Sequence, residues 1–233
     1  MRHAGLTDAE LELLTSPAPE LAEAVQMPGD ISGAAPILRE SDEVGADLPH
    51  ASLMDLHRDF AEALRLRLSK FARRDVSVLL RDQSSGSYAQ FVFGQVVPTC
   101  CAVVRARSID LEFWLAFQPS ILYPIMDRML GSRESDPIPQ RPLSEIESGL
   151  AMIILNDIIT AYGDAWQRAL SLELRIERLV HNVQQLGGAA GSEPTWRVRY
   201  GLQCGQDFGL LDFCIPWATS QQIRKRLAAS HTS

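Results

Sequence analysis

One order of secondary-structure signals occurs twice along this chain of 233 residues. A long amphipathic pattern, strands, a strand pair and a short helix fill residues 51–132, and the same order returns over 142–229. A shift of 97 residues places Pro119 on Pro216. The repeat indicates an internal duplication. Because short turns favour antiparallel strands and helices must cover a sheet, we expect a layered α/β/α sandwich of the α+β kind with an internal pseudo-two-fold repeat.

The first half begins with a long helix, predicted by apolar residues at three- and four-residue steps: Leu53, Leu56, Phe60, Leu64, Leu68 and Phe71. A short helix at its end has Gly131 where a C-terminal glycine belongs, and it accommodates Pro124 only in its first turn. The other segments are a strand at 75–82, a looser segment at 86–98, two strands within 100–119 joined near Ser108, and the short helix at 120–132.

The second half begins with a long helix over 142–170, in which Ser144 and Glu147 have the spacing of a capping box. We expect Leu150 on the buried face of this helix. The following segments are a strand at 172–180, a strand pair at 195–205 and 208–216, and a short helix at 217–228.

The N-terminal region differs from the body in charge. Residues 1–50 hold ten of the 29 acidic residues and two of the 22 basic ones, whereas the remainder is nearly neutral. Four prolines interrupt residues 16–48. We therefore predict a peptide at 1–18, a flexible acidic linker at 19–49 and a folded domain at 50–230, with halves of about 51–132 and 142–229.

A helix signal lies at the tip of this tail, in "GLTDAELELLTS". Thr7 or Asp8 can cap it, and Leu11 and Leu14 form an apolar seam. About nine residues make an unstable helix in water unless they pack on something. The seam therefore predicts docking on the body of this protein or on another protein.

Catalytic and metal-binding patterns are missing from the sequence. It contains no GxSxG, Walker, GxGxxG or HExxH motif and no CxxC pair, so we expect no cofactor, no metal and no enzyme activity. Glu145 and Glu147 favour a helix N-terminus rather than a carboxylate pair. We expect Asp157 and Asp164, seven residues apart, to form a solvated stripe on one face of their helix. The four cysteines suit buried free thiols on strands, which is typical of a reducing compartment.

Nucleic-acid and membrane partners are disfavoured. The acidic tail repels both, and the basic run 224–226 complements the end of its own helix. No run of 18 apolar residues and no signal-peptide pattern occur, so we expect a cytoplasmic protein without direct membrane insertion.

The order of segments resembles the flagellar motor switch protein FliM family, over residues 1–18 and 50–230. Members begin with the pattern L-S-Q-D-E-I-D-A-L-L, which Ala9, Leu13 and Thr15 depart from here. The matching residues are Leu6, Thr7, Glu10, Leu11, Glu12 and Leu14. In the body, "FARRDVSVLLRDQ", "FQPSILYPIMDRMLG", "RPLSEIE" and "CIPWATSQQIRKRL" are similar to family segments in the same order.

The resemblance implies a fold like the CheC and FliM middle domains and a role in the flagellar C-ring at the inner face of the membrane. There the N-terminal peptide would capture a phosphorylated CheY-like response regulator, beside FliG and neighbouring copies, and help set the direction of rotation in chemotaxis. The family's glycine-rich turn toward FliG corresponds here to Gly131, Ser132, Arg133 and Glu134, of which only the first is glycine.

Two alternatives remain open at this point. The family ordinarily continues into a small β domain that pairs with FliN, which we expect to be absent, on another chain or removed; an adaptor in a type III secretion-like platform would suit that form. The fold also resembles CheC-type phosphatases, whose helices carry a Glu-x-x-Asn pair. Here the residues three before Asn156 and Asn182, where the motif has glutamate, are Ile153 and Leu179.

Overall fold

The computed structural model describes residues 50–107, 111–132, 137–167, 170–187 and 189–221. Within them, six strands form one antiparallel sheet in the order β1-β5-β6-β3-β2-β4. The strands are β1 (Ser77–Ser87), β2 (Cys100–Ala106), β3 (Leu111–Phe117), β4 (Leu174–Val180), β5 (Pro194–Cys204) and β6 (Asp207–Pro216). The labelled helices are α2 (His50–Ala72), α3 (Tyr88–Phe93), α4 (Pro119–Met129), α5 (Glu145–Trp166) and the short 3-10 turn η2 (Val183–Gln185). Residues 217–221, the last ones described, are also helical.

The sheet order confirms the internal pseudo-two-fold repeat. Exchanging β1 with β4, β5 with β2 and β6 with β3 leaves the order unchanged, and the pairs β1–β5, β6–β3 and β2–β4 each join strands of different halves. The offset of 97 is wrong inside the strands, however. Leu115 faces the main core, as Leu211 and Phe213 do, whereas an offset of 97 would match it to Asp212 on the opposite face. A one-residue slip reverses every side chain of a strand.

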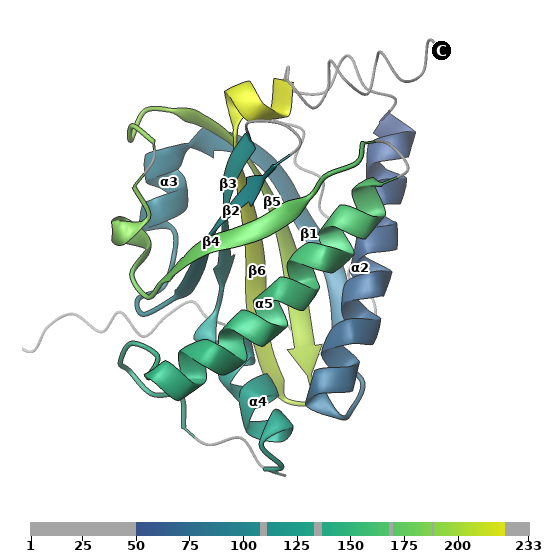
Figure 1. Cartoon of the computed structure of the whole chain (residues 1–233), viewed down its shortest axis with the longest axis vertical. Helices are drawn as coiled ribbons and strands as arrows, with labels where there is room; N and C mark the ends of the chain where they lie inside the picture. The colour runs from purple at the N-terminus through teal and green to yellow at the C-terminus, as the bar shows by residue number, and fades with distance from the viewer. Residues whose placement is uncertain (1–49, 108–110, 133–136, 168–169, 188, 222–233) are drawn as a thin grey trace, which may run out of the picture. The chain divides into compact units, whose positions relative to one another are not determined.

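Helices cover both faces of the sheet unequally (Figure 1). The long helices α2 and α5 pack together with α4 over one face, which holds the main core. On the other face, α3 and η2 cover a smaller cluster that includes Trp114 and Leu186. The predicted α/β/α sandwich is therefore confirmed, with one thick and one thin helical layer.

The periodicity of α2 predicted its buried face correctly. Phe60, Leu64 and Leu68 are fully buried, and Leu56 is nearly so. In α5, Leu150 is partly buried and packs against the main core, on the same side of the helix as the fully buried Ile154 and Ile158, so the expected face of this helix is also confirmed. The predicted capping box of Ser144 and Glu147 is confirmed.

A short helix was missed between the first two strands. The segment expected to be loose forms α3, whose N-terminus has a capping box between Ser87 and Gln90. The S-x-x-Q spacing was a readable signal for it. The strand before it, β1, is also longer than expected, because residues through Ser87 pair with β5.

The free cysteines lie in the core as predicted. Cys100, Cys101, Cys204 and Cys214 are all unpaired and buried on strands. Burial raises the pKa of the Cys100 and Cys214 thiols to about 12, so these groups stay protonated and unreactive.

A histidine lies fully buried near the start of α2. The Nδ1 atom of His57 shares a 2.7 Å hydrogen bond with the hydroxyl group of Tyr200, and the ring packs edge-on against Trp196. Its Nε2 atom has no hydrogen-bond partner in the described residues. Burial therefore lowers the pKa of His57 from 6.5 to about 4.

Acidification from pH 7 to pH 5 should lower the free energy of unfolding by about 2 kcal/mol through His57. The unfolded chain takes up this proton near pH 6.5 and the folded chain only near pH 4, so the stability is intact above 6.5 and is lost as the pH falls. Urea denaturation at both pH values measures the change. A His57→Gln variant should lose most of the pH dependence between 7 and 5, whatever its absolute stability. An unchanged pH dependence in that variant would contradict the assignment.

Candidate interaction surfaces

The predicted regulator-docking residues all lie outside the described part of the chain. They are Leu6, Thr7, Glu10, Leu11, Glu12 and Leu14. The structure therefore leaves this site as a sequence prediction, joined to the described body at His50.

The turn predicted to face FliG begins at the end of α4. Ser132 N donates to the Asp127 carbonyl at 2.9 Å and Gly131 N to that of Arg128 at 3.1 Å, which is the Schellman pattern. Gly131 has φ of 98°, as predicted for a C-terminal glycine. Next to it, Leu130 is largely exposed. Arg133 and Glu134 lie outside the described residues, so the turn is seen only at its start.

The position of Pro124 within α4 differs from the one expected. The helix begins at Pro119, so Pro124 lies in its second turn rather than its first. Its carbonyl accepts a 2.9 Å hydrogen bond from Arg128, whose guanidinium also pairs with Asp207 at 3.0 Å. This buried arginine ties α4 to the start of β6.

Replacing Gly131 by alanine should destabilise the protein by about 1 kcal/mol, because its positive φ strains any residue with a Cβ. Gly149, in the interior of α5, is the matched control, since an added Cβ there also meets nothing within 4 Å. There alanine should stabilise by about 0.5–1 kcal/mol. Chemical denaturation of both variants measures the difference. Effects of the same sign would contradict the backbone argument.

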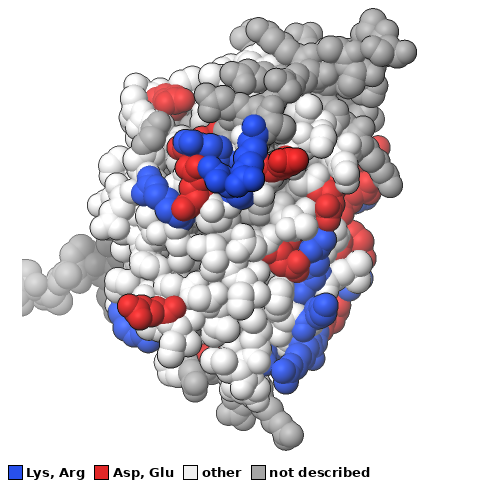
Figure 2. All heavy atoms as spheres, viewed as in Figure 1, with Lys and Arg blue, Asp and Glu red and all other residues white. Residues whose placement is uncertain are grey.

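Charges on the face seen in Figure 2 are of mixed sign rather than gathered into one basic patch. Arg67 of α2 contacts Asp157 and Asp164 of α5, the second at 2.9 Å. The two aspartates are accessible to solvent as expected, Asp164 at 59%, and they also form an interhelical ion-pair site that the expectation did not include. Their partner lies about ninety residues away along the chain, which spacing alone cannot reveal.

The carboxylates at the start of α5 have structural roles. Glu147 accepts from the Ser144 backbone and pairs with Arg141 at 2.7 Å. The Arg141 guanidinium is the main reason why the pKa of Glu147 falls to about 2. Asn156 is exposed on α5, three residues after Ile153, and Asn182 caps η2 instead. The described residues thus assemble no Glu-x-x-Asn pair on α5.

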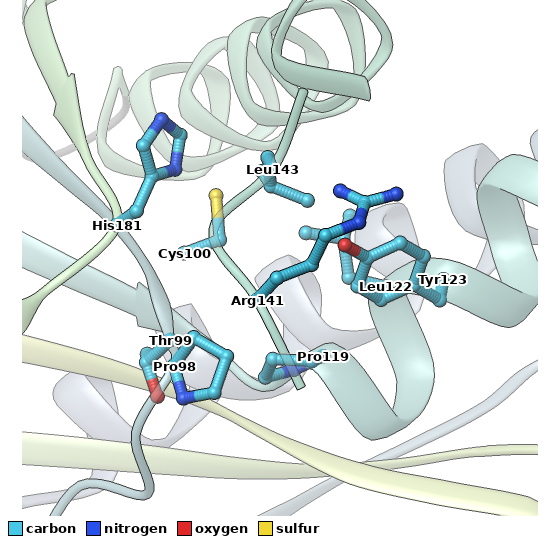
Figure 3. Close-up of a pocket in the computed structure, with 9 residues that line it drawn as sticks. All are labelled: Pro98, Thr99, Cys100, Pro119, Leu122, Tyr123, Arg141, Leu143 and His181. Carbon is cyan, nitrogen blue, oxygen red and sulfur yellow. The ribbon is translucent and has the colours of Figure 1, made fainter. Parts of the chain in front are cut away.

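A small pocket lies between α4, the loop before α5 and the start of β2 (Figure 3). Its walls include Pro98, Leu122 and Leu143, and its cavity volume is about 10 Å³. The Tyr123 hydroxyl and His181 Nδ1 have no hydrogen-bond partner in the described residues. This volume is below the roughly 300 Å³ at which ligand sites begin, so we assign no cofactor to it.

Among the described residues, no three histidine, cysteine, aspartate or glutamate side chains lie together as metal ligands. None of the helices in this part of the chain is both long and apolar enough to span a membrane.

These observations define a class of protein that is built on a duplicated α/β domain and presents exposed turns and helix faces at its surface. The family model of flagellar motor switch protein FliM matches residues 50–232. The chain therefore belongs to the FliM family.

Curated relatives agree with this family. FliM of Treponema pallidum (strain Nichols) is 25% identical over 174 residues, which are 75% of this chain and 51% of the relative. FliM of Bacillus subtilis (strain 168) is 21% identical over 180 residues, 77% of this chain and 54% of the relative. The chain thus spans about half the length of the curated relatives it matches.

Solved structures agree on the fold. The FliM middle domain of H. pylori has a TM-score of 0.69 at 22% identity and covers 76% of this chain and 96% of its own. A FliG–FliM complex of H. pylori has a TM-score of 0.72 at 23% identity, and the match covers 75% of this chain and 96% of that chain. FliY of Thermotoga maritima has a TM-score of 0.65 at 11% identity, and the match covers 78% of this chain and 98% of that chain. These identities are low, so the likeness concerns the fold of the described domain.

Proposed function

We propose that this chain is a non-enzymatic component of the flagellar motor switch complex that captures a phosphorylated CheY-like regulator and helps to set the direction of rotation. The observation that carries the proposal is the family match over 50–232 behind an N-terminal peptide with the family's docking pattern. The protein would then lie in the C-ring, peripheral to the inner face of the cell membrane.

The regulator would dock on the apolar seam of the tip. Leu11 and Leu14 are three residues apart, so they would share one side of the expected helix. Laying such a helix into a groove orders it, at a cost of about 2–5 kcal/mol, so the affinity should be modest and reversible. The acidic linker would keep a captured regulator at raised effective concentration near the body.

A FliG-like protein is the second proposed partner, together with neighbouring copies of this chain. Support comes from the H. pylori FliM of the same fold, which was solved in complex with FliG. In this chain the turn after α4 keeps one glycine, with positive φ, beside the exposed Leu130. The proposed contact therefore uses this turn, with side chains in place of the family's other glycines.

Titration of the full chain with phosphorylated and unphosphorylated CheY-like regulator from the same organism tests the proposal. We expect micromolar binding, on the order of −8 kcal/mol, that strengthens on phosphorylation. Leu14→Asp should abolish this binding and leave the urea denaturation of the body unchanged. Leu13→Asp, one residue away and off the seam, is the matched control and should bind as the parent does. Equal binding by Leu14→Asp, or no binding by the parent, would refute regulator capture.

A further inference from the structure

Two clusters of large apolar side chains remain exposed on the described surface. The first, the loop patch, consists of Phe93, Val96 and Val97 at and after the end of α3. The second, the helix stripe, consists of Ile146 and Ile153 on α5, with Gly149 between them. Phe93 is 79% exposed and Ile146 76% exposed. Each patch therefore leaves apolar area in water that burial against a partner would remove.

The loop patch is held in place by a buried polar network. Gln95, within the loop, donates to the buried carboxylate of Asp212 on β6 at 2.9 Å. Arg199 makes two further 2.7 Å hydrogen bonds to the same carboxylate. At the far end, the Thr99 hydroxyl donates to the Val96 carbonyl. A loop fixed in this way presents its apolar side chains with little entropy left to lose on binding.

The helix stripe has a notch at its centre. Gly149 is exposed in the interior of α5, and a Cβ placed there would meet nothing within 4 Å. Alanine would therefore fit and would favour the helix, so the fold of one copy gives no reason for glycine. Between Glu147 and Asp157 no residue of α5 is ionisable. Figure 2 accordingly shows mainly uncharged surface in the lower centre, where α5 lies in Figure 1.

We propose that the loop patch of one copy packs on the helix stripe of the next copy, with Phe93 over Gly149 and between Ile146 and Ile153. A protruding aromatic ring and a glycine notch between two isoleucines are complementary in shape and apolar character. One charge pair would add to the fit. Arg197 lies beside Gly94 in the loop and 3.8 Å from Asp82, and Glu145 lies exposed at the start of the stripe.

Contact between two different surfaces has a consequence for assembly. A heterologous interface passes from copy to copy and yields a ring or a filament, according to the rotation at each step. Each patch offers roughly 300 Å², well below the ~800 Å² per partner of stable complexes. The contact should therefore form at high local concentration and not as a dimer in dilute solution. This inference details the self-assembly part of the proposed function and rests on it.

Crosslinking of the full chain tests the contact. A Phe93→Cys and Gly149→Cys double variant, concentrated and treated with a short bismaleimide, should give a ladder of covalent oligomers. The native thiols compete little, because all four are buried. The control pair combines Phe93→Cys with Leu66→Cys, which replaces another exposed apolar residue, on α2. We expect about tenfold more ladder from the first pair than from the control.

The single variants decide between geometries. Head-to-tail contact predicts that neither Phe93→Cys nor Gly149→Cys alone forms crosslinked dimers above background. Efficient dimers of Gly149→Cys alone would show a two-fold α5–α5 contact and overturn the proposal, as would equal ladders from the two pairs. Regulator binding is measured on the same preparations. A missing ladder with intact regulator binding overturns only this contact, whereas an intact ladder without regulator binding overturns only the docking peptide.

Discussion

Phe60→Ala should lower the free energy of unfolding by about 4 kcal/mol, the largest effect expected of a single substitution in the core. The Phe60 ring is fully buried on α2 and meets three aromatic rings edge-on. Their centroids lie 5.1 Å away for Tyr162 of α5, 5.1 Å for Tyr200 of β5 and 5.6 Å for Phe213 of β6. Alanine would remove the contact that joins both long helices to the centre of the sheet.

Urea denaturation followed by circular dichroism measures this loss. Phe60→Leu keeps most of the volume, so about 1 kcal/mol should be lost. Leu66→Ala on the same helix is the matched control. Its side chain is 56% exposed, and the change should stay within about 0.5 kcal/mol. A Phe60→Ala variant as stable as this control would contradict the central place of the ring.

Asp212→Ala should cost about 3 kcal/mol, the second largest effect. The carboxylate is almost fully buried and accepts hydrogen bonds from Arg199 and Gln95. The hydrogen bonds that Arg199 donates to Asp212 are the main reason why the pKa of Arg199 is raised. A guanidinium also stays protonated without such a partner, so Arg199 remains charged when the carboxylate is removed. Because that charge and the buried Gln95 amide would be left unpaired, truncation should be far more harmful than for a surface pair.

Asp82→Ala supplies the comparison. Asp82 lies 3.8 Å from Arg197, and both side chains are about a quarter exposed, so the loss should be under about 1 kcal/mol. Both variants can be measured by the same denaturation series. Equal losses would show that the buried network around Asp212 contributes no more than a surface ion pair.

Local patterns predicted the helices well for a physical reason. The helical period of Phe60, Leu64 and Leu68 reports directly which side of α2 is buried, since burial of apolar area drives the packing. Caps are equally local, as Ser144 with Glu147 and Gly131 show. The same rule would have revealed α3 from Ser87 and Gln90, although six residues give little periodicity to read.

Long-range pairings could not be predicted in this way. The ion pairs of Asp157 and Asp164 were not expected, because their partner, Arg67, belongs to the other half of the chain. The network of Gln95, Asp212 and Arg199 likewise joins a loop to two strands. Charge pairing depends on distance in space, which the order of residues does not give when the separation is long.

The sequence by itself determined the duplicated α/β architecture, the long helices, most strands, the buried cysteines and the family, because these follow from local period, capping and order of segments. Only the tertiary structure decided the strand order, the offset between the halves and the buried polar network. It also decided which apolar side chains stay exposed. Phe93 and Ile153 look like core residues in the sequence, yet both lie on the surface. Exposure depends on how elements from both halves pack together, and no single stretch of chain contains that information.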